Sequence, residues 1–582
     1  MDLVVAQSLS APAATAFSVA ARCTARSLRS PATSSQAHRC RHDIDSSAGV
    51  AVPGPERDHR FVAAAAGLGL GLACALSNRR GRRLVPCSAA TGKAVDAVPA
   101  IRSAAGAAVA EALGDELLAL RREASLTLRP LIIAMGTRGD VEPCLHLATA
   151  LRKRGHEPLV LSLDEWGDRI SDRWGLDFTS SGIAHLPMSE DYLTGQTRAD
   201  QVYADRGWYG DAWGEVGRRI FKAATEHKCD VIVSTSMGNT HALDVAEHLG
   251  LLCIAVKFAP DIDGQVPTGL FPPSGYPTGM PGPLNYAAHV LENLRTIGAV
   301  FAGGFIPRVI AFRTELGLPS QELADGIEVP VYSPYRQILQ ANQPCIYAFN
   351  KSLVERPAEY QSWHFFTGVL GGNSSAAADV EDLDPELETF LGCSEKETSA
   401  GPLCITFGSI TLARSAPFEA RALAAARRTM RRVIVIDPKC EKEGLQEDQD
   451  SGKLGPVYWL RAAPYSKLFS RVSLVVHHGG AGTMQDCLRA ATPQIVAPVL
   501  RWSDQPYWAS VVEARGLGLA LGSGGEAPEE EAWAETFTRA LARLEEMKGA
   551  ARAVSEQAAR EMGAEEACEV LEGAMAAVPT QA

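Results

Sequence analysis

The 582-residue chain lacks the features that mark several common classes of protein. Its 13 cysteines have neither the paired spacing of a zinc site nor the density of a disulfide framework. Those at 229, 253, 345, 404 and 487 mostly stand inside apolar runs, so we predict ordinary core thiols. A net charge of −12 leaves no basic surplus, which argues against a nucleic-acid partner. The length is sufficient for two or three domains.

Acidic residues are missing from the start of the chain, where none stands between Asp2 and Asp43 while arginines recur among Ala, Ser and Thr. This composition is typical of an organelle transit segment. A second apolar stretch, Phe61 to Leu76, falls short of the about 20 residues of a membrane span. It fits the hydrophobic part of a plastid-targeting leader or a weak membrane anchor, and a disordered extension without a targeting signal is the third possibility. We predict that residues 1–127 are a mostly disordered, low-complexity targeting leader, and that the protein is plastid or otherwise organellar; without that address it would be cytoplasmic or membrane-associated.

From Leu128 onward, short apolar runs alternate with helical patterns, which predicts two α/β domains with parallel sheets. The first domain spans 128–371 and includes a long Pro/Gly-rich loop (261–283) followed by a helical region (284–316). A polar stretch, 372–401, is expected to be a solvated linker with one short helix at 385–391. The second domain spans 402–582 and ends in helices. The predicted strands of the two domains are 131–134, 159–163, 231–234, 252–256, 345–349, 365–369, 403–407, 433–436, 457–460 and 494–498.

A glycine-rich turn in the second domain, His477 to Thr483, follows an apolar run and precedes a helical pattern. Its glycines let the backbone approach a ligand closely, and the first turn of the helix offers unpaired N–H groups to a phosphate. The turn is not a Walker loop, because no Lys-Ser/Thr closes it, and its glycine spacing differs from the dinucleotide fingerprint. Farther along the chain stands Arg501-Trp502-Ser503-Asp504-Gln505-Pro506.

A second strand-to-helix turn opens the first domain and reads Gly136-Thr137-Arg138-Gly139-Asp140-Val141-Glu142-Pro143. Pro143 is expected at the first position of the following helix. Asp140 is a candidate general base if burial raises its pKa, and it is otherwise a helix cap. His146 and His156 are rival candidates, although His156, at a basic helix end, is predicted to be structural.

Together, the two turns resemble the UDP-glycosyltransferase family, and within it the branch of the sterol and glycopeptide glucosyltransferases. The resemblance covers roughly Leu128 to Leu521. It implies a GT-B type fold, in which two Rossmann-like domains face each other. It also implies that the first domain binds the acceptor and the second binds a UDP-sugar.

The resemblance assigns roles to the residues that match the family's motifs. His478 would contact the diphosphate, Gly480, Gly482 and Thr483 would present backbone and hydroxyl donors to it, and Ser409 would bind phosphate from the other side. These groups are hydrogen-bond donors, as a diphosphate requires.

Other matches concern the sugar, the ribose and the nucleobase. Asp504 and Gln505 match the acid–amide pair that holds the sugar hydroxyls, and Asp486 falls where some members hold the ribose with a glutamate. The chain departs from the plant members at the tryptophan that stacks on uracil, because Ala462 stands there and Trp459 lies three positions earlier.

In the first domain, the resemblance makes Asp140 the catalytic base and places Gly136, Thr137, Arg138 and Gly139 on the donor side. Arg138 would steady the diphosphate or the acceptor, or else form a surface salt bridge.

The Asp-x-Asp triplets at 261–263 and 448–450 have the spacing of a metal-binding motif, and both are interpreted as turn formers. We therefore expect no metal and no cofactor, with the UDP-sugar as a co-substrate. The predicted reaction is an inverting transfer of a hexose, glucose by resemblance, to a hydroxyl of a lipophilic acceptor such as a sterol, with possible peripheral membrane contact. The alternatives are a non-catalytic sugar-nucleotide or lipid-binding relative and a nucleotide-sugar epimerase of the same architecture.

Overall fold

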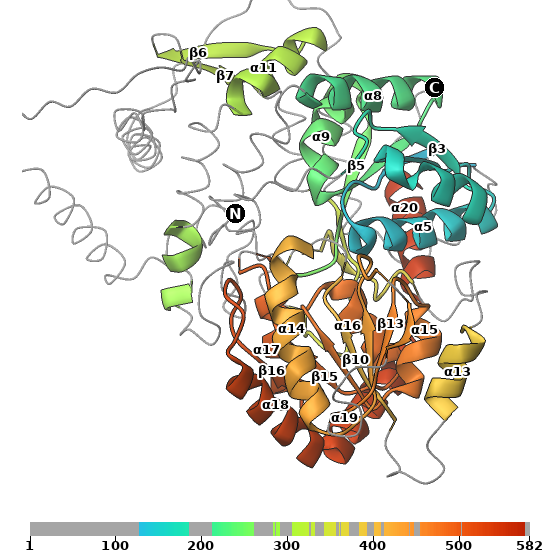
Figure 1. Ribbon diagram of the computed structural model, residues 1–582. Coiled ribbons are helices and arrows are strands. Elements are labelled where there is room, and N and C mark those ends of the chain that lie inside the picture. Colours follow the sequence, from blue (N-terminus) through green and yellow to red (C-terminus); the bar gives the residue numbers. More distant parts are fainter. Residues whose placement is uncertain are drawn as a thin grey trace, which may run out of the picture. The chain divides into compact units, whose positions relative to one another are not determined.

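The computed structural model describes most of the chain from residue 127 onward (Figure 1). The described residues are 127–185, 212–260, 283–291, 305–324, 327–331, 343–371, 383–392, 401–408, 412–446 and 454–576, apart from residues 286, 357–359, 361, 442 and 502. The expected leader, both Asp-x-Asp triplets and Ser409 lie outside them. None of the helices in this part of the chain combines the length and the hydropathy that a transmembrane span requires.

The first domain is built on a seven-stranded parallel sheet with the order β3-β2-β1-β4-β5-β8-β9. Its strands are β1 (Pro130–Ile133), β2 (Leu159–Ser162), β3 (Asp177–Ser180), β4 (Val231–Thr235), β5 (Leu252–Lys257), β8 (Cys345–Tyr347) and β9 (His364–Phe366). A parallel sheet needs cover on both faces, which is why its strands read as near-continuous apolar runs. One face packs with α8 (Ala212–Glu226), α9 (Asn239–Leu249) and α11 (Phe305–Glu315). The domain also contains the short helical segments η1 (Asp164–Trp166), η2 (Arg169–Arg173) and η3 (Ser236–Gly238) and the antiparallel pair β6 (Ser320–Ala324) and β7 (Ile327–Pro330).

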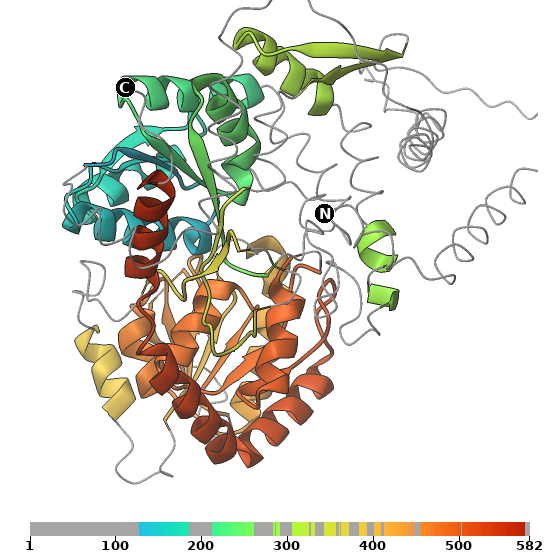
Figure 2. The same ribbon diagram turned by 180° about the vertical axis from the view of Figure 1, so that it is seen from behind.

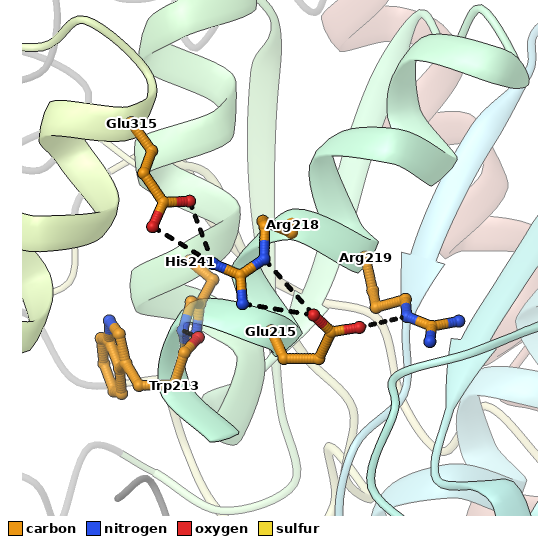
Figure 3. Close-up of polar contacts among 6 residues, drawn as sticks. All are labelled: Trp213, Glu215, Arg218, Arg219, His241 and Glu315. Atoms are coloured by element: carbon orange, nitrogen blue, oxygen red, sulfur yellow. Dashed lines mark hydrogen bonds and ion pairs between the residues drawn. The ribbon is translucent and has the colours of Figure 1, made fainter. Parts of the chain in front are cut away.

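Polar contacts tie the three helices of that face together (Figure 3). Arg218 of α8 bonds Glu215 on its own helix and reaches both oxygens of Glu315 on α11 at 3.1 Å. The fully buried His241 of α9 contacts the backbone oxygen of Trp213 at 3.0 Å. Burial lowers the pKa of His241 to about 4, so this histidine is neutral at physiological pH.

The second domain has a seven-stranded sheet with the order β12-β13-β11-β10-β14-β15-β16, parallel except at the β12 edge. Its strands are β10 (Leu403–Thr406), β11 (Val433–Ile436), β12 (Gly444–Gln446), β13 (Val457–Leu460), β14 (Leu474–His477), β15 (Gln494–Val496) and β16 (Gly518–Ala520). Its helical elements are α13 (Pro385–Gly392), α14 (Leu412–Arg428), α15 (Tyr465–Leu468), η5 (Phe469–Arg471), α16 (Ala481–Arg489), α17 (Gln505–Ala514), α18 (Glu530–Ala542) and α19 (Leu544–Ala558). The last helix, α20 (Gly563–Ala576), packs through Ala567, Cys568 and Leu571 on the core that α5 (Arg138–Lys153) shares with the first sheet (Figure 2).

The strand order in both sheets reverses beside the domain's first strand. In the first sheet, β2 and β4 flank β1, and in the second, β11 and β14 flank β10. Open parallel sheets bind their ligands beyond the carboxyl ends of the strands at such a switch point. The two motif-bearing turns follow β1 and β14, so each lies at the switch point of its own sheet.

The expectation that Pro143 opens the first helix is wrong, because α5 already begins at Arg138. Thr137 is the N-cap residue, and Asp140, at the third helical position, accepts a hydrogen bond from its N–H as in a capping box. Pro143 lies in the second turn of α5, where it has no N–H to donate to the carbonyl oxygen four residues earlier.

The eight cysteines among the described residues are all buried and unpaired by disulfides, which confirms them as core thiols. Helix α14 begins at Leu412, and strand β12 is not among the strands predicted from the sequence. The short helix expected at 385–391 exists as α13, and its Leu387 and Phe390 pack into the core of the second sheet.

Candidate active site

The turn after β14 is shaped by two consecutive glycines. Gly479 has a φ of +92°, in the region that favours glycine. A Cβ at Gly479 would stand 2.8 Å from a methyl carbon of Val496, and a Cβ at Gly480 would stand 2.5 Å from Nε2 of His478. Gly480 is also the N-cap of α16. These residues must therefore be glycines if the turn is to hold the imidazole directly before a helix N-terminus.

His478 is buried, with 8% of its surface exposed. Gly408, after β10, has a φ of +72°, and a Cβ there would stand 2.8 Å from Cε1 of His478. The Nδ1 atom has no hydrogen-bond partner among the described residues. Burial, together with the neighbouring His477, lowers the pKa of His478 to about 3, so its ring is neutral at physiological pH. A buried polar atom without a partner marks a place where a ligand can bind.

His477 presents the opposite picture, because both of its ring nitrogens are used. Nδ1 accepts the N–H of Gly479 at 3.0 Å, and Nε2 lies 2.8 Å from Oε1 of Gln494 on β15. Sequence reasoning missed this pair, and the only available signal was the doubled histidine at the end of an apolar run.

The Asp504–Gln505 turn lies directly beside the glycine turn, since a Cβ at Gly479 would stand 3.0 Å from the backbone oxygen of Gln505. The Gln505 side-chain oxygen accepts the N–H groups of Val499 and Leu500 at 2.9 Å each. Asp504 accepts the indole N–H of Trp508 at 3.0 Å. The structure thus places Gln505 beside Gly479 of the glycine turn, while a role of the acid–amide pair in holding sugar hydroxyls stays a prediction.

After β1, the carboxylate of Asp140 is held by hydrogen bonds from Thr137, the N-cap residue of α5. Its Oδ2 accepts the backbone N–H and the hydroxyl of Thr137, at 2.8 Å and 3.0 Å. Gly136 has a φ of +134°, and a Cβ there would stand 2.4 Å from the same oxygen. Oδ1 accepts no hydrogen bond from the described part of the chain. Burial raises the pKa of Asp140, although the two bonds from Thr137 oppose the shift.

The two turns approach each other at their glycines, because a Cβ at Gly482 would stand 3.8 Å from Cα of Gly139. Beside them, the guanidinium of Arg138 lies over the ring of Tyr465, 5.5 Å from its centroid. Arg138 also forms the salt bridge that sequence analysis allowed for, with Glu142 at 2.7 Å. The site residues predicted in the first domain and those predicted in the second therefore lie close together.

Other predicted residues have protein partners. Asp486 on α16 pairs with Arg489, and burial raises its pKa although Arg489 and Arg138 oppose the shift. His156 accepts the N–H of Leu128 at 3.1 Å and bonds Glu572 at 3.0 Å, which confirms its structural role. Its rival His146 lies edge-on to Trp174, and Thr483 stands in the first turn of α16.

Comparison with known proteins supplies the fold's identity. The chain is 17% identical to the glycotransferase of kitacinnamycin and to the glycosyltransferase VinC solved with DTDP, each with a TM-score of 0.53. The matches cover 77% of this chain and 98% and 99% of those proteins. The chain has the GT-B glycosyltransferase fold.

Sequence relatives agree with that fold. No protein-family model matches the chain. It is 28% identical over 452 residues to the O-mycaminosyltylonolide 6-deoxyallosyltransferase of Streptomyces fradiae, a match over 76% of this chain and 97% of that protein. It is 25% identical over 427 residues to the sterol 3-beta-glucosyltransferase of Neurospora crassa, covering 71% of this chain but 25% of that longer protein. The predicted resemblance to glycosyltransferases of the sterol branch and its bacterial relatives is confirmed, and the GT-B turns after β1 and β14 are its candidate active site.

Proposed function

We propose that this GT-B protein is an inverting, metal-independent glycosyltransferase. It moves a hexose, with glucose as the favoured sugar, from a UDP-sugar to a hydroxyl of a lipophilic acceptor such as a sterol. The observation that carries the proposal is the pairing of a buried, unsatisfied His478 at a helix N-terminus with a carboxylate, Asp140, in the turn that approaches it.

The second domain would bind the leaving diphosphate. The first turn of α16 has backbone N–H groups without intrahelical partners, and the helix dipole favours negative charge there. Neutral His478 carries one ring N–H and can donate one hydrogen bond to a phosphate oxygen. Fixed donors of this kind stabilise the charge that develops on the leaving group. Gly480 and Gly482 allow the phosphates to come close to this backbone.

The first domain would activate the acceptor. Oδ2 of Asp140 is held by Thr137, and Oδ1 remains to accept a proton from the acceptor hydroxyl. The hydroxyl oxygen then bonds to the anomeric carbon, the bond from that carbon to the diphosphate breaks, and UDP leaves. Attack opposite the leaving group inverts the anomeric configuration. Partial burial supports the base role, because it raises the pKa of the carboxyl toward the working pH.

The substrates are suggested by relatives alone. Several matched proteins are sterol 3-beta-glucosyltransferases, and one from Dictyostelium discoideum is a UDP-sugar-dependent glycosyltransferase at 25% identity. The 6-deoxyallosyltransferase from Streptomyces fradiae shows that other sugars and acceptors occur at similar identity. A sterol and UDP-glucose are therefore the first substrates to test, and TDP-sugars the second.

A non-catalytic relative is the competing reading, and the capping bonds of Asp140 are the observation that favours it. The test is UDP release from UDP-glucose, with and without a sterol mixture and with EDTA. We expect release that the acceptor stimulates, that EDTA does not abolish and that His478→Ala reduces strongly. Nucleotide binding without stimulated release by any acceptor would support the binding protein, and loss of activity in EDTA would contradict the metal-free mechanism.

A further inference from the structure

His477, the last residue of β14, takes no part in the proposed chemistry although it adjoins the diphosphate turn. Its side chain is fully buried and lies on the same side of the sheet as Gln494 of the neighbouring strand. Because Nδ1 accepts the N–H of Gly479, the ring proton must be on Nε2, where it is donated to the amide oxygen of Gln494. Gln494 thus stabilises the tautomer of His477 that accepts the N–H of Gly479.

The bond from Gly479 fixes one peptide unit of the turn. That unit joins His478 to Gly479, a buried residue with φ of +92° whose N–H would otherwise face the interior without a partner. His478 makes no hydrogen bond of its own through Nδ1 to the described residues, so its position depends on packing and on this peptide. The orientation of the His478 ring, which is predicted to bind phosphate, therefore depends partly on the hydrogen bond between His477 and Gly479.

A simpler reading is that His477 is a satisfied core histidine that only stabilises the sheet. Two observations favour more than that. The donor to Nδ1 belongs to the turn itself and not to the sheet, and Gln494 holds the ring in the one tautomer that can accept this donor. Burial lowers the pKa of His477 to about 4, so the accepting form persists at physiological pH.

We infer that His477 is a positioning residue for the nucleotide-diphosphate subsite, and that Gln494 acts through it by fixing its tautomer. The inference rests on the proposed function, since it names a residue that shapes the same subsite. It predicts that the accepting atom at the Nδ1 position matters more for nucleotide binding than the rest of the ring does.

Two substitutions separate these atoms. Asparagine carries its amide oxygen on Cγ, where histidine carries Nδ1, so His477→Asn can keep the acceptor for Gly479 while it loses the contact with Gln494. His477→Gln reaches toward Gln494 but has no acceptor on Cγ. We expect hydrogen exchange of residues 478–482 to remain slow in His477→Asn and to accelerate in His477→Gln. UDP affinity should stay near wild type in the first variant and fall about fivefold in the second, the effect of losing one ordinary hydrogen bond.

Val475→Ala is the matched control, because Val475 is equally buried on the same strand and its side chain belongs to a hydrophobic core cluster. It should lower thermal stability and leave UDP affinity unchanged. If the two His477 variants lose affinity equally, or neither does while both lose stability, the positioning role is overturned. A wild-type protein that binds neither UDP nor TDP would refute the proposed function instead, and hydrogen exchange, which needs no nucleotide, would still decide whether His477 orders the turn.

Discussion

Asp140 is both a helix cap and the proposed base, and two substitutions should separate these roles. Asparagine retains an oxygen that can accept the two bonds from Thr137, now at 2.8 Å and 3.0 Å, and the third helical position of a capping box accepts an amide as well as a carboxylate. Alanine retains neither. We expect Asp140→Asn to keep the stability of the wild type and Asp140→Ala to lose about 1 kcal/mol. Both should lower kcat, by about 10²–10⁴-fold, because neither can take the proton.

The sign of the electrostatic contribution supports the first expectation. The folded-state pKa of Asp140 is raised, so ionisation of this group costs stability, and that cost appears as the pH rises through the folded-state pKa. An asparagine avoids the cost at pH 7 to 8. Urea unfolding would give the stabilities, and acceptor-stimulated UDP release would give kcat.

Asp384 offers a control outside the site, because its Oδ1 accepts the N–H of Glu386 at 2.8 Å near the start of α13. Asp384→Ala should lose a similar stability, about 1 kcal/mol, and keep its kcat. An Asp140→Asn protein that turns over like the wild type would show that Asp140 is a cap alone. If that variant instead unfolds as easily as Asp140→Ala, the hydrogen-bond reasoning is wrong.

Two further predictions concern the same turns. Thr137→Val removes the hydroxyl that holds the pKa of Asp140 down, so the acidic limb of the kcat/KM profile should move to higher pH; an unmoved limb would mean that Asp140 does not set it. Gly480→Ala keeps an allowed backbone conformation, with φ of −61°, but its new methyl would stand 2.5 Å from Nε2 of His478. It should raise the Kd for UDP about tenfold or more, the loss of one bond to a charged group, with little change in Tm; titration calorimetry with UDP and a thermal melt would show whether the imidazole is used at all.

Much of the fold could be predicted from the sequence where strands are buried on both faces. The runs that became β1, β10 and β14 are apolar throughout, and glycine-rich turns follow them, so both the strands and the switch-point turns are visible in the residue order. Strand β12 could not be predicted, because two of its three residues are exposed and it exists only by pairing with β13. Residues 444–446 therefore form a strand because of their pairing in the sheet and not because of their own residue pattern.

The start of α5 is a different case, since the signal was present. Thr137 and Asp140 have the spacing of a capping box, and Asp140 fills the place of the usual Glu or Gln. Pro143 suggested a later start because proline favours the first helical turn. The tertiary pair of His477 and Gln494 was beyond sequence reasoning, because the two residues meet only through the register of β14 on β15.

The stereochemistry of the product depends directly on whether Asp140 activates an acceptor hydroxyl for a single displacement at the anomeric carbon. The measurement is the anomeric proton signal, by NMR, of the glycoside that the wild-type protein forms from UDP-glucose, whose sugar is α-linked, and a sterol acceptor. We expect a β-glycoside whose formation is slowed by about 10²–10⁴-fold in Asp140→Asn. An α-glycoside would contradict the single displacement, and a β-glycoside formed equally well by Asp140→Asn would contradict the role of the carboxylate.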